Sequence, residues 1–161
     1  IAKTMGYPLL VFVKDVDRTS ATKKSDRERR TKLASMHAEI KAGFGAVADA
    51  DAVLRIKATP CRMIEAWALG DPAALAQVGE KRQKREPAPK EPETLWGPEL
   101  DPLSDHPKCV LRRCLGKEAN TFIFEELAHE GTEKTLRASC PESFAPFADE
   151  VANAARALAR R

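Results

Sequence analysis

Apolar residues first gather in a short continuous run near the start of the chain. The run Leu9–Val13 reads Leu-Leu-Val-Phe-Val, follows Gly6 and Pro8, and ends at charged residues. Such a run is typical of a strand that is buried on both faces of a parallel sheet. Residues 53–58 then alternate apolar and basic side chains, which predicts a second strand.

Between these two strands the apolar period lengthens to three or four residues. This pattern predicts a helix from about Asp26 to the mid-forties. Gly43 and Gly45 should fray the end of this helix. Ser25 and Glu28 have the spacing of a capping box at its start. Strand, helix and strand within about fifty residues predict a βαβ unit with a right-handed crossover.

Further helices are predicted along the rest of the chain. A short one should run from Cys61 to Leu69 and stop at Gly70, and Asp71-Pro72 should start the next. The last third is predicted to be helical, with helices at 107–115, 122–128 and 132–138 and a final one after the capping box Ser139-x-x-Glu142.

The stretch between these regions has a different character. Residues 79–106 contain five prolines and many charges, and no apolar period runs through them. We therefore expect an exposed, mobile insertion with Trp96 as a docking point. The chain then divides into an α/β core at 1–78, this insertion at 79–106, and a helical C-terminal part at 107–161 that packs on the core.

Composition limits the class of protein. Of 161 residues, 43% are hydrophobic and 32% are charged, which allows a packed core. No stretch approaches the roughly 18 apolar residues of a membrane helix, and no signal-peptide pattern is visible. We therefore expect a cytoplasmic protein that does not enter a membrane. The four cysteines lack the spacing of a zinc site, which favours reduced thiols.

Charge is distributed unevenly although the net charge is only +3. Residues 18–32 contain seven basic side chains against two acidic ones. A run of this kind is either a solvated face or a surface that contacts phosphates. The residues that we expect to contact phosphates are Lys23, Lys24, Arg29 and Arg30 from this run and Arg112 and Arg113 from a later helix.

Three carboxylates stand at the predicted carboxyl ends of the strands, where open parallel sheets bind their ligands. Asp15 and Asp17 directly follow the first strand, and an Asp-x-Asp pair there can direct both side chains to one Mg²⁺ or Mn²⁺ ion. The alternative is that the pair only ends a strand and caps a turn. Glu65 lies in an apolar stretch after the second strand, where it binds a metal, pairs with Arg62 or Arg55, or is exposed.

Two blocks of the chain resemble a known family. Leu-Leu-Val-Phe-Val-Lys-Asp-Val-Asp resembles the strand and Asp-x-Asp motif of Toprim-like domains, and Arg-Met-Ile-Glu-Ala-Trp-Ala-Leu-Gly-Asp-Pro resembles a block of an uncharacterised bacterial Toprim-like family related to the OLD nucleases. His-Pro-Lys-Cys-Val-Leu-Arg-Arg-Cys-Leu-Gly, Phe-Glu-Glu-Leu-Ala and Leu-Arg-Ala-Ser-Cys-Pro-Glu-Ser-Phe fit that family's layout as well. The resemblance covers most of the chain outside the proline-rich stretch.

The resemblance implies a Toprim-like parallel sheet with flanking helices and a Mg²⁺-dependent nuclease that hydrolyses DNA or RNA, in phage defence or as a toxin. It makes Asp15, Asp17 and Glu65 the catalytic, metal-binding residues. Toprim catalysis also uses a glutamate on an earlier strand, and no such strand precedes Leu9. We expect either that residues before Ile1 carry it or that the site has lost its active form.

Two other functions remain open. The chain is alternatively a non-catalytic interaction or regulatory subunit of a larger complex, for example with an ATPase. A plain nucleic-acid-binding module is the third possibility. Against it, no aromatic side chain lies within the basic run at 18–32, so that run lacks a platform on which bases can stack.

Overall fold

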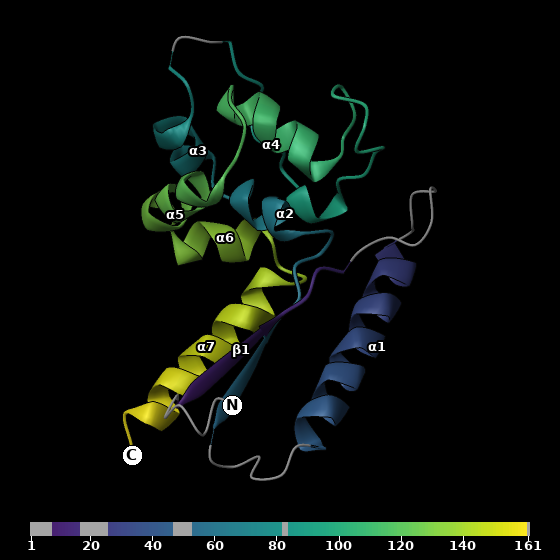
Figure 1. The fold of residues 1–161 in the computed structure, drawn as a ribbon, viewed down its shortest axis with the longest axis vertical. Helices are drawn as coiled ribbons and strands as arrows, with labels where there is room; N and C mark the ends of the chain where they lie inside the picture. The colour runs from purple at the N-terminus through teal and green to yellow at the C-terminus, as the bar shows by residue number, and fades with distance from the viewer. Residues whose placement is uncertain (1–7, 17–25, 47–52, 82–83, 161) are drawn as a thin grey trace.

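The chain folds into a small parallel sheet with two flanking helices and a second group of helices beyond one end of the sheet (Figure 1). The structure is a computed structural model and describes residues 8–16, 26–46, 53–81 and 84–160. These residues form two strands, seven α-helices and one short 3₁₀ helix. The predicted mixed α/β class is confirmed at this level, and the described part is mostly helical.

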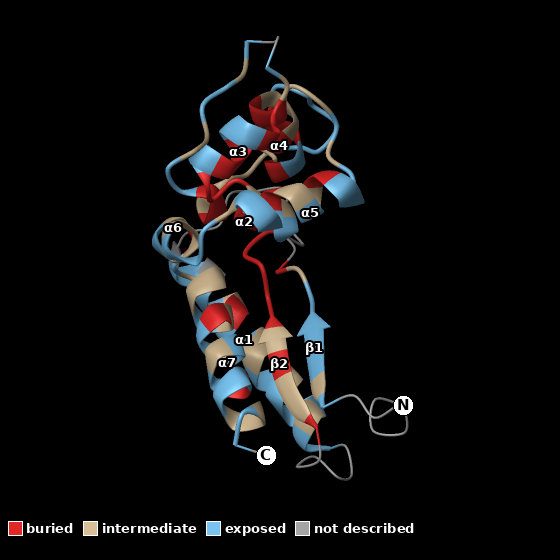
Figure 2. Ribbon diagram, turned by 90° about the vertical axis from the view of Figure 1, so that its left-hand side faces the viewer, coloured by how far each residue is buried: buried red, intermediate tan, exposed pale blue. Residues whose placement is uncertain are grey.

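The sheet consists of β1 (Leu9–Val13) and β2 (Leu54–Ala58), which pair in parallel with Leu9 opposite Leu54. Pairing continues beyond the strands, because Val16 forms a parallel bridge with Cys61. Both strands were predicted at these positions. The expectation that β1 is buried on both faces is wrong: Val13 is 58% exposed, and the three residues before it are also exposed. Figure 2 shows β1 largely exposed beside the more buried β2.

Two helices flank the sheet on opposite sides. On one side, α1 (Asp26–Gly45) packs against it through Leu33 and through an edge-to-face contact of Phe44 with Phe12. On the other side, α7 (Phe144–Leu158) lies along β2. The βαβ unit predicted from the sequence is thus present. The capping box at Ser25 lies outside the described residues.

The second group of helices has its own hydrophobic core. Its members are α2 (Ile64–Ala68), α3 (Pro72–Val78), α4 (Pro107–Leu115), α5 (Thr121–Glu130) and α6 (Glu133–Ser139). Buried side chains of α3, α4 and α5 meet in the core, and Leu111 and Leu115 are fully buried there. The sequence placed helices at each of these positions, with ends that differ by a few residues.

Local chemistry explains where several of these helices begin and end. Asp71 caps α3, since its carboxylate accepts hydrogen bonds from the backbone N–H groups of Ala73 and Ala74. Gly116 ends α4 with a φ of 71°, the left-handed conformation that glycine adopts without strain. Both ends agree with the sequence. In contrast, α2 begins at Ile64 rather than Cys61, because Cys61 continues the sheet and Arg62 has a φ of 78°.

The start of α7 differs from the prediction as well. Ser139 was expected to cap this helix with Glu142, but Ser139 is the last residue of α6. The N-cap of α7 is Ser143, and its hydroxyl bonds to other parts of the chain rather than to the helix. The predicted capping box is therefore wrong. The chain turns at Cys140, whose carbonyl accepts a hydrogen bond from Phe144 N.

The proline-rich stretch packs on the rest of the protein at several points, and Ala88 and Leu95 lie against the core of the helical group. It contains the 3₁₀ helix η2 (Pro92–Thr94), in which Pro92 and Glu93 are buried. Leu100 and Leu103, further along, are almost fully exposed. The mobility expected for residues 79–106 stays a prediction, and amide hydrogen exchange would measure it.

No helix among the described residues is long and apolar enough to cross a lipid bilayer. All four cysteines are free and buried, as the scattered spacing suggested. Burial raises the pKa of the Cys114 thiol to about 11 and also raises the pKa of Cys140. The thiols of Cys114 and Cys140 therefore stay protonated near neutral pH.

Candidate functional site

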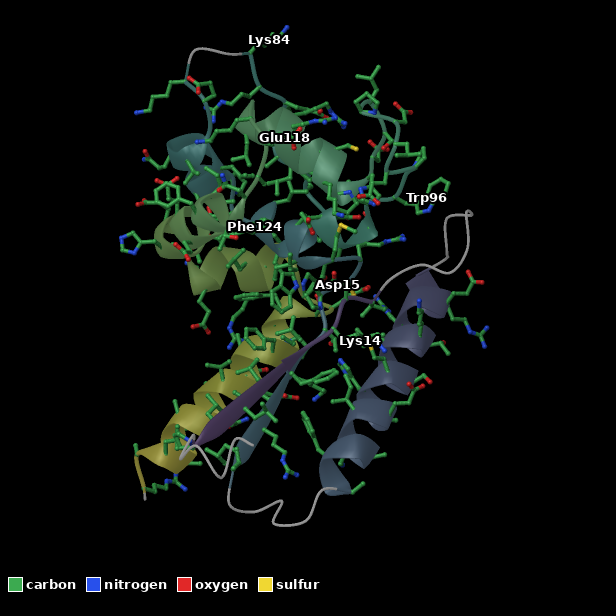
Figure 3. The ribbon with its side chains drawn as sticks, viewed as in Figure 1. Lys14, Asp15, Lys84, Trp96, Glu118 and Phe124 are labelled. Carbon is green, nitrogen blue, oxygen red and sulfur yellow. The ribbon has the colours of Figure 1, made fainter. Side chains whose placement is uncertain are left out.

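Asp15 is held at the end of β1 by the residues on either side of it. Lys14 N donates a hydrogen bond to Ala58 O at 2.9 Å, and Val16 N donates one to Pro60 O at 3.0 Å. The backbone at Asp15 is therefore extended alongside the chain that leaves β2. Because side chains alternate along an extended chain, Asp15 lies on the face opposite to Val16, which packs under α1. Figure 3 shows Asp15 where β1 reaches the group of helices.

Glu65 comes from the element that follows β2. It is the second residue of α2, after the turn at Arg62, and its side chain is half-buried. The helix is held down on its other face by the buried residues Ala66 and Trp67.

Asp15 and Glu65 line the same cavity, although fifty positions separate them in the sequence. Its volume is about 880 Å³, within the usual range for sites that bind small molecules. Asp17, the third predicted carboxylate, lies outside the described residues. The structure thus brings together the two predicted acids that it describes, at the carboxyl end of a parallel sheet.

A second wall of the cavity is formed by the proline-rich stretch and the start of α4. Trp96, Glu99, His106 and Lys108 lie on it. Lys108 Nζ donates a hydrogen bond to Glu99 Oε1 at 2.8 Å. This bond, together with the negative charges of Glu99 and, further away, of Glu65 and Asp15, raises the pKa of Lys108. The carboxylates therefore face a lysine that stays protonated.

His106 lies on the same wall, but its pKa is lowered, whereas that of Lys108 is raised. Burial lowers its pKa below the usual 6.5, while the charge of Glu99 offsets part of that effect. A histidine with a lowered pKa is mostly neutral near pH 7, so it can accept a proton. The cavity therefore combines carboxylates, a permanent cation and a neutral imidazole.

The basic residues predicted to contact phosphates lie elsewhere or are outside the description. Lys23 and Lys24 are not among the described residues, and the structure describes the backbone of Arg29 but not its side chain. Arg30, on α1, donates a hydrogen bond to Glu142 at 3.2 Å. This contact joins α1 to the chain just before α7.

The two arginines of α4 do not line the carboxylate cavity. Arg112 forms an ion pair with Glu118, and Arg113 forms one with Glu86. Arg113 also donates to the carbonyl oxygens of Pro102 and Ser104, at 2.7 and 2.8 Å. Both arginines line a separate groove. The structure therefore does not bring them to Asp15 and Glu65, and Arg113 has a structural role in holding the loop before α4.

A buried carboxylate that the sequence did not single out holds the two sides of the site together. Glu93 accepts hydrogen bonds from Glu142 N and Ser143 N, both at 2.8 Å, and from the Ser143 hydroxyl. The same hydroxyl accepts bonds from Cys61 N at 3.0 Å and Trp67 Nε1 at 2.7 Å. We call these five residues the Glu93 network.

The Glu93 network connects three segments that surround the cavity. It joins η2, from which the wall with Trp96 continues, to the start of α7 and to the chain between β2 and α2. Burial raises the pKa of Glu93, and the three donors around it offset part of this effect. The negative charge of Glu142 adds to the rise, so the net effect on the pKa of Glu93 is upward.

Sequence reasoning missed the residues of the second wall for a physical reason. Lys108 and His106 lie in the block His-Pro-Lys, which the sequence marks only through its resemblance to a known family. Glu93 sits between prolines and charges in a stretch without an apolar period. A buried carboxylate there has no local signature, since its donors come from residues about fifty positions later.

The carboxylates are suited to a hard divalent cation. Mg²⁺ is commonly bound through one or two carboxylates, with water and phosphate oxygens completing its shell, and Asp15 and Glu65 fit that requirement. Within the described ranges, no group of three or more His, Cys, Asp or Glu side chains is arranged to hold a metal ion. A third ligand from the chain would have to come from outside them, as Asp17 would.

The chain was compared with known protein families, with characterised proteins and with solved structures, and none of these comparisons finds a match. What the site does chemically must therefore be inferred from its own residues.

Proposed function

We propose that this protein is a metal-dependent nuclease with a Toprim-like core, in which Asp15, Asp17 and Glu65 bind Mg²⁺ or Mn²⁺. The observation that carries the proposal is the meeting of Asp15 and Glu65 in one cavity at the carboxyl end of parallel strands, a cavity that Lys108 also lines. This is where open α/β sheets bind ligands. Phosphodiester hydrolysis is the reaction class for which carboxylates and a cation in one cavity are suited.

Each described residue has a distinct task in this proposal. Bound Mg²⁺ supplies charge stabilisation and an activated water. Asp15 and Glu65 hold the cation, and Lys108 binds a phosphate oxygen from the other wall. Lys108 is available for this, because it and Glu99 are about half exposed and an ion pair at such a surface is weak. His106, kept neutral by burial, can take up or deliver a proton.

Metal-dependent stabilisation tests the proposal without relying on turnover. At ten times its dissociation constant, a metal bound only to the folded chain stabilises it by about 1.4 kcal/mol. Melting of the wild type should therefore rise by several degrees in millimolar Mn²⁺. Asp15→Asn and Glu65→Gln should each remove this shift and the Mn²⁺-dependent cleavage of a labelled oligonucleotide, while leaving the metal-free melting temperature nearly unchanged.

A matched control is Glu125→Gln, which removes an exposed carboxylate on α5 that does not line the cavity. It should keep the full metal response. Wild-type melting that is indifferent to 10 mM Mn²⁺, together with no cleavage of DNA or RNA, would overturn the proposal.

A non-catalytic interaction subunit is the second candidate, and the exposed side chains of β1 favour it. Leu10, Val11 and Phe12 are each about 40% exposed, and no described strand pairs with the outer edge of β1. Apolar strands with an open edge pair readily with another chain. The absence of a metal response, combined with tight association through β1, would favour this candidate over the nuclease.

A further inference from the structure

Trp96 gives the candidate cavity a feature that metal binding alone does not require. It is half-buried and lines the cavity together with Lys108 and the carboxylates Asp15 and Glu65. Figure 3 shows Trp96 on the loop beside the helices, above and to the right of Asp15 in that view. A large aromatic ring beside a lysine is the combination with which proteins hold a nucleobase and its phosphate.

Several contacts fix Trp96 relative to Lys108. A Cβ atom at Gly97 would lie 2.8 Å from Ser104 Cβ and 2.9 Å from Asp105 N, so only glycine allows this approach of the two segments. The Ser104 hydroxyl donates a hydrogen bond to Pro98 O at 2.7 Å. The loop that carries Trp96 is thus packed directly on the segment that leads into α4 and Lys108.

The same loop is anchored from its other end. Glu93, three positions before Trp96, is bound to the start of α7 by the Glu93 network. The Trp96 ring is therefore carried by a segment that is attached on both sides, and little further ordering is needed when a ligand binds. Preorganisation of this kind raises affinity without adding contacts.

We propose that the cavity takes an unpaired nucleotide of a single-stranded nucleic acid, with its base stacked on Trp96 and its phosphate held by Lys108 toward Asp15 and Glu65. The inference rests on the proposed nuclease function and specifies its substrate class. In a duplex both faces of each base are covered by neighbouring pairs, so stacking on Trp96 requires a base that has left the helix. Stacking is tolerant of sequence, since every base has an aromatic face.

Binding is measured with the full chain and labelled twelve-residue probes in Ca²⁺, which limits cleavage. The probes are oligo-dT, oligo-U and a DNA duplex of mixed sequence with its separated strand. Wild-type protein should bind the single strands at least tenfold more tightly than the duplex, and the dT and U probes show whether DNA or RNA is preferred. Trp96→Ala should weaken single-strand binding about tenfold or more. Phe122→Ala, which removes an exposed ring on α5 away from the cavity, should leave it unchanged.

Fluorescence provides a second readout that does not depend on the alanine variant folding well. The chain has two tryptophans, and Trp67 is buried in the Glu93 network. A stacked base should quench wild-type fluorescence, and Trp96→Phe should remove the quenching while anisotropy still reports binding. Unquenched Trp96 fluorescence on saturation with oligo-dT and oligo-U, or duplex binding as tight as single-strand binding, would overturn the inference.

Cleavage assays in Mn²⁺ separate this inference from the proposed function. If duplex is hydrolysed as fast as single strands and Trp96→Ala has no effect, the nuclease stands and the single-strand inference fails. If single strands bind through Trp96 but no probe is hydrolysed, the inference stands and the nuclease fails. If no probe binds, both fail.

Discussion

Replacing Glu93 tests whether its buried carboxylate holds the site together. Glu93 accepts three hydrogen bonds, two from backbone N–H groups and one from the Ser143 hydroxyl. A hydrogen bond to a charged group contributes about 1.5–3 kcal/mol, and these three share one acceptor and do not add fully. Glu93→Ala would leave the donors buried and unpaired, so we expect a loss of about 3–5 kcal/mol in the free energy of unfolding.

A loss of that size is a large part of a typical domain's stability, so the milder variant Glu93→Gln is more informative. Glutamine has nearly the same volume, but one of its two terminal atoms becomes a donor that faces another donor. We expect it to cost about 1–3 kcal/mol in urea-induced unfolding. Glu91→Gln, at an exposed position two residues earlier, is the matched control and should change stability by no more than about 0.5 kcal/mol.

The pH dependence of stability provides an independent test of Glu93, because the direction of the change with pH can be predicted. Burial raises the pKa of Glu93 above its ordinary 4.5, so the folded chain holds this proton at pH values where the unfolded chain has lost it. The stability linked to this group is therefore fully present below pH 4.5 and is lost as pH rises through the folded-state pKa. Glu93→Gln lacks this titration. The stability difference between wild type and the Gln variant should thus decrease with rising pH in that window.

Glu93→Gln should affect metal binding at the site as well as the stability of the fold. Because the Glu93 network fixes both the wall with Trp96 and the chain before α2, Glu93→Gln should also weaken the Mn²⁺-induced rise in melting temperature. A Gln variant that unfolds within 0.5 kcal/mol of wild type and keeps the full metal response would refute the assigned role of Glu93.

Two further predictions concern other parts of the fold. Asp71 caps α3 and also accepts hydrogen bonds from Thr132 N and Oγ1, at 2.9 and 3.3 Å, so Asp71→Ala should cost about 2–4 kcal/mol. Asn120→Ala, which removes a simple cap from α5, should cost only about 1 kcal/mol in the same urea titration. At β1, Val13→Lys should change the unfolding free energy of the isolated chain by no more than about 0.5 kcal/mol, because Val13 is already 58% exposed. A larger loss would mean that a second chain covers this face, and sedimentation analysis would then show an oligomer that the variant disrupts.

Features with a local cause could be predicted from the sequence. The apolar run at 9–13, the helical period after Asp26, and the signals at Asp71 and Gly116 each act through residues next to one another, and each element is found where it was expected. The burial of β1 could not be predicted in this way. Its exposure depends on which strands lie beside it, and an apolar run only shows that a strand suits a buried position.

The candidate site likewise contains residues that could be predicted from the sequence and residues that could not. Asp15 and Glu65 could be placed together because parallel strands bring their carboxyl ends to one edge. The second wall could not be foreseen, because Trp96 and Lys108 reach the cavity through a stretch with no periodic pattern. The phosphate contacts predicted at Arg112 and Arg113 rest on charge alone, and charge does not show that both side chains line a different groove from the carboxylates.

The four buried thiols can serve as natural probes of local unfolding. Cys114 lies in the core of the helical group, whereas Cys61 lies under α1 beside the end of the sheet. Alkylating reagents modify thiolates, so each cysteine reacts only when its surroundings open. Labelling followed by mass spectrometry would therefore measure the opening free energy of each part separately. If Cys61 is modified well before Cys114, the edge that carries Asp15 comes apart while the helices remain folded.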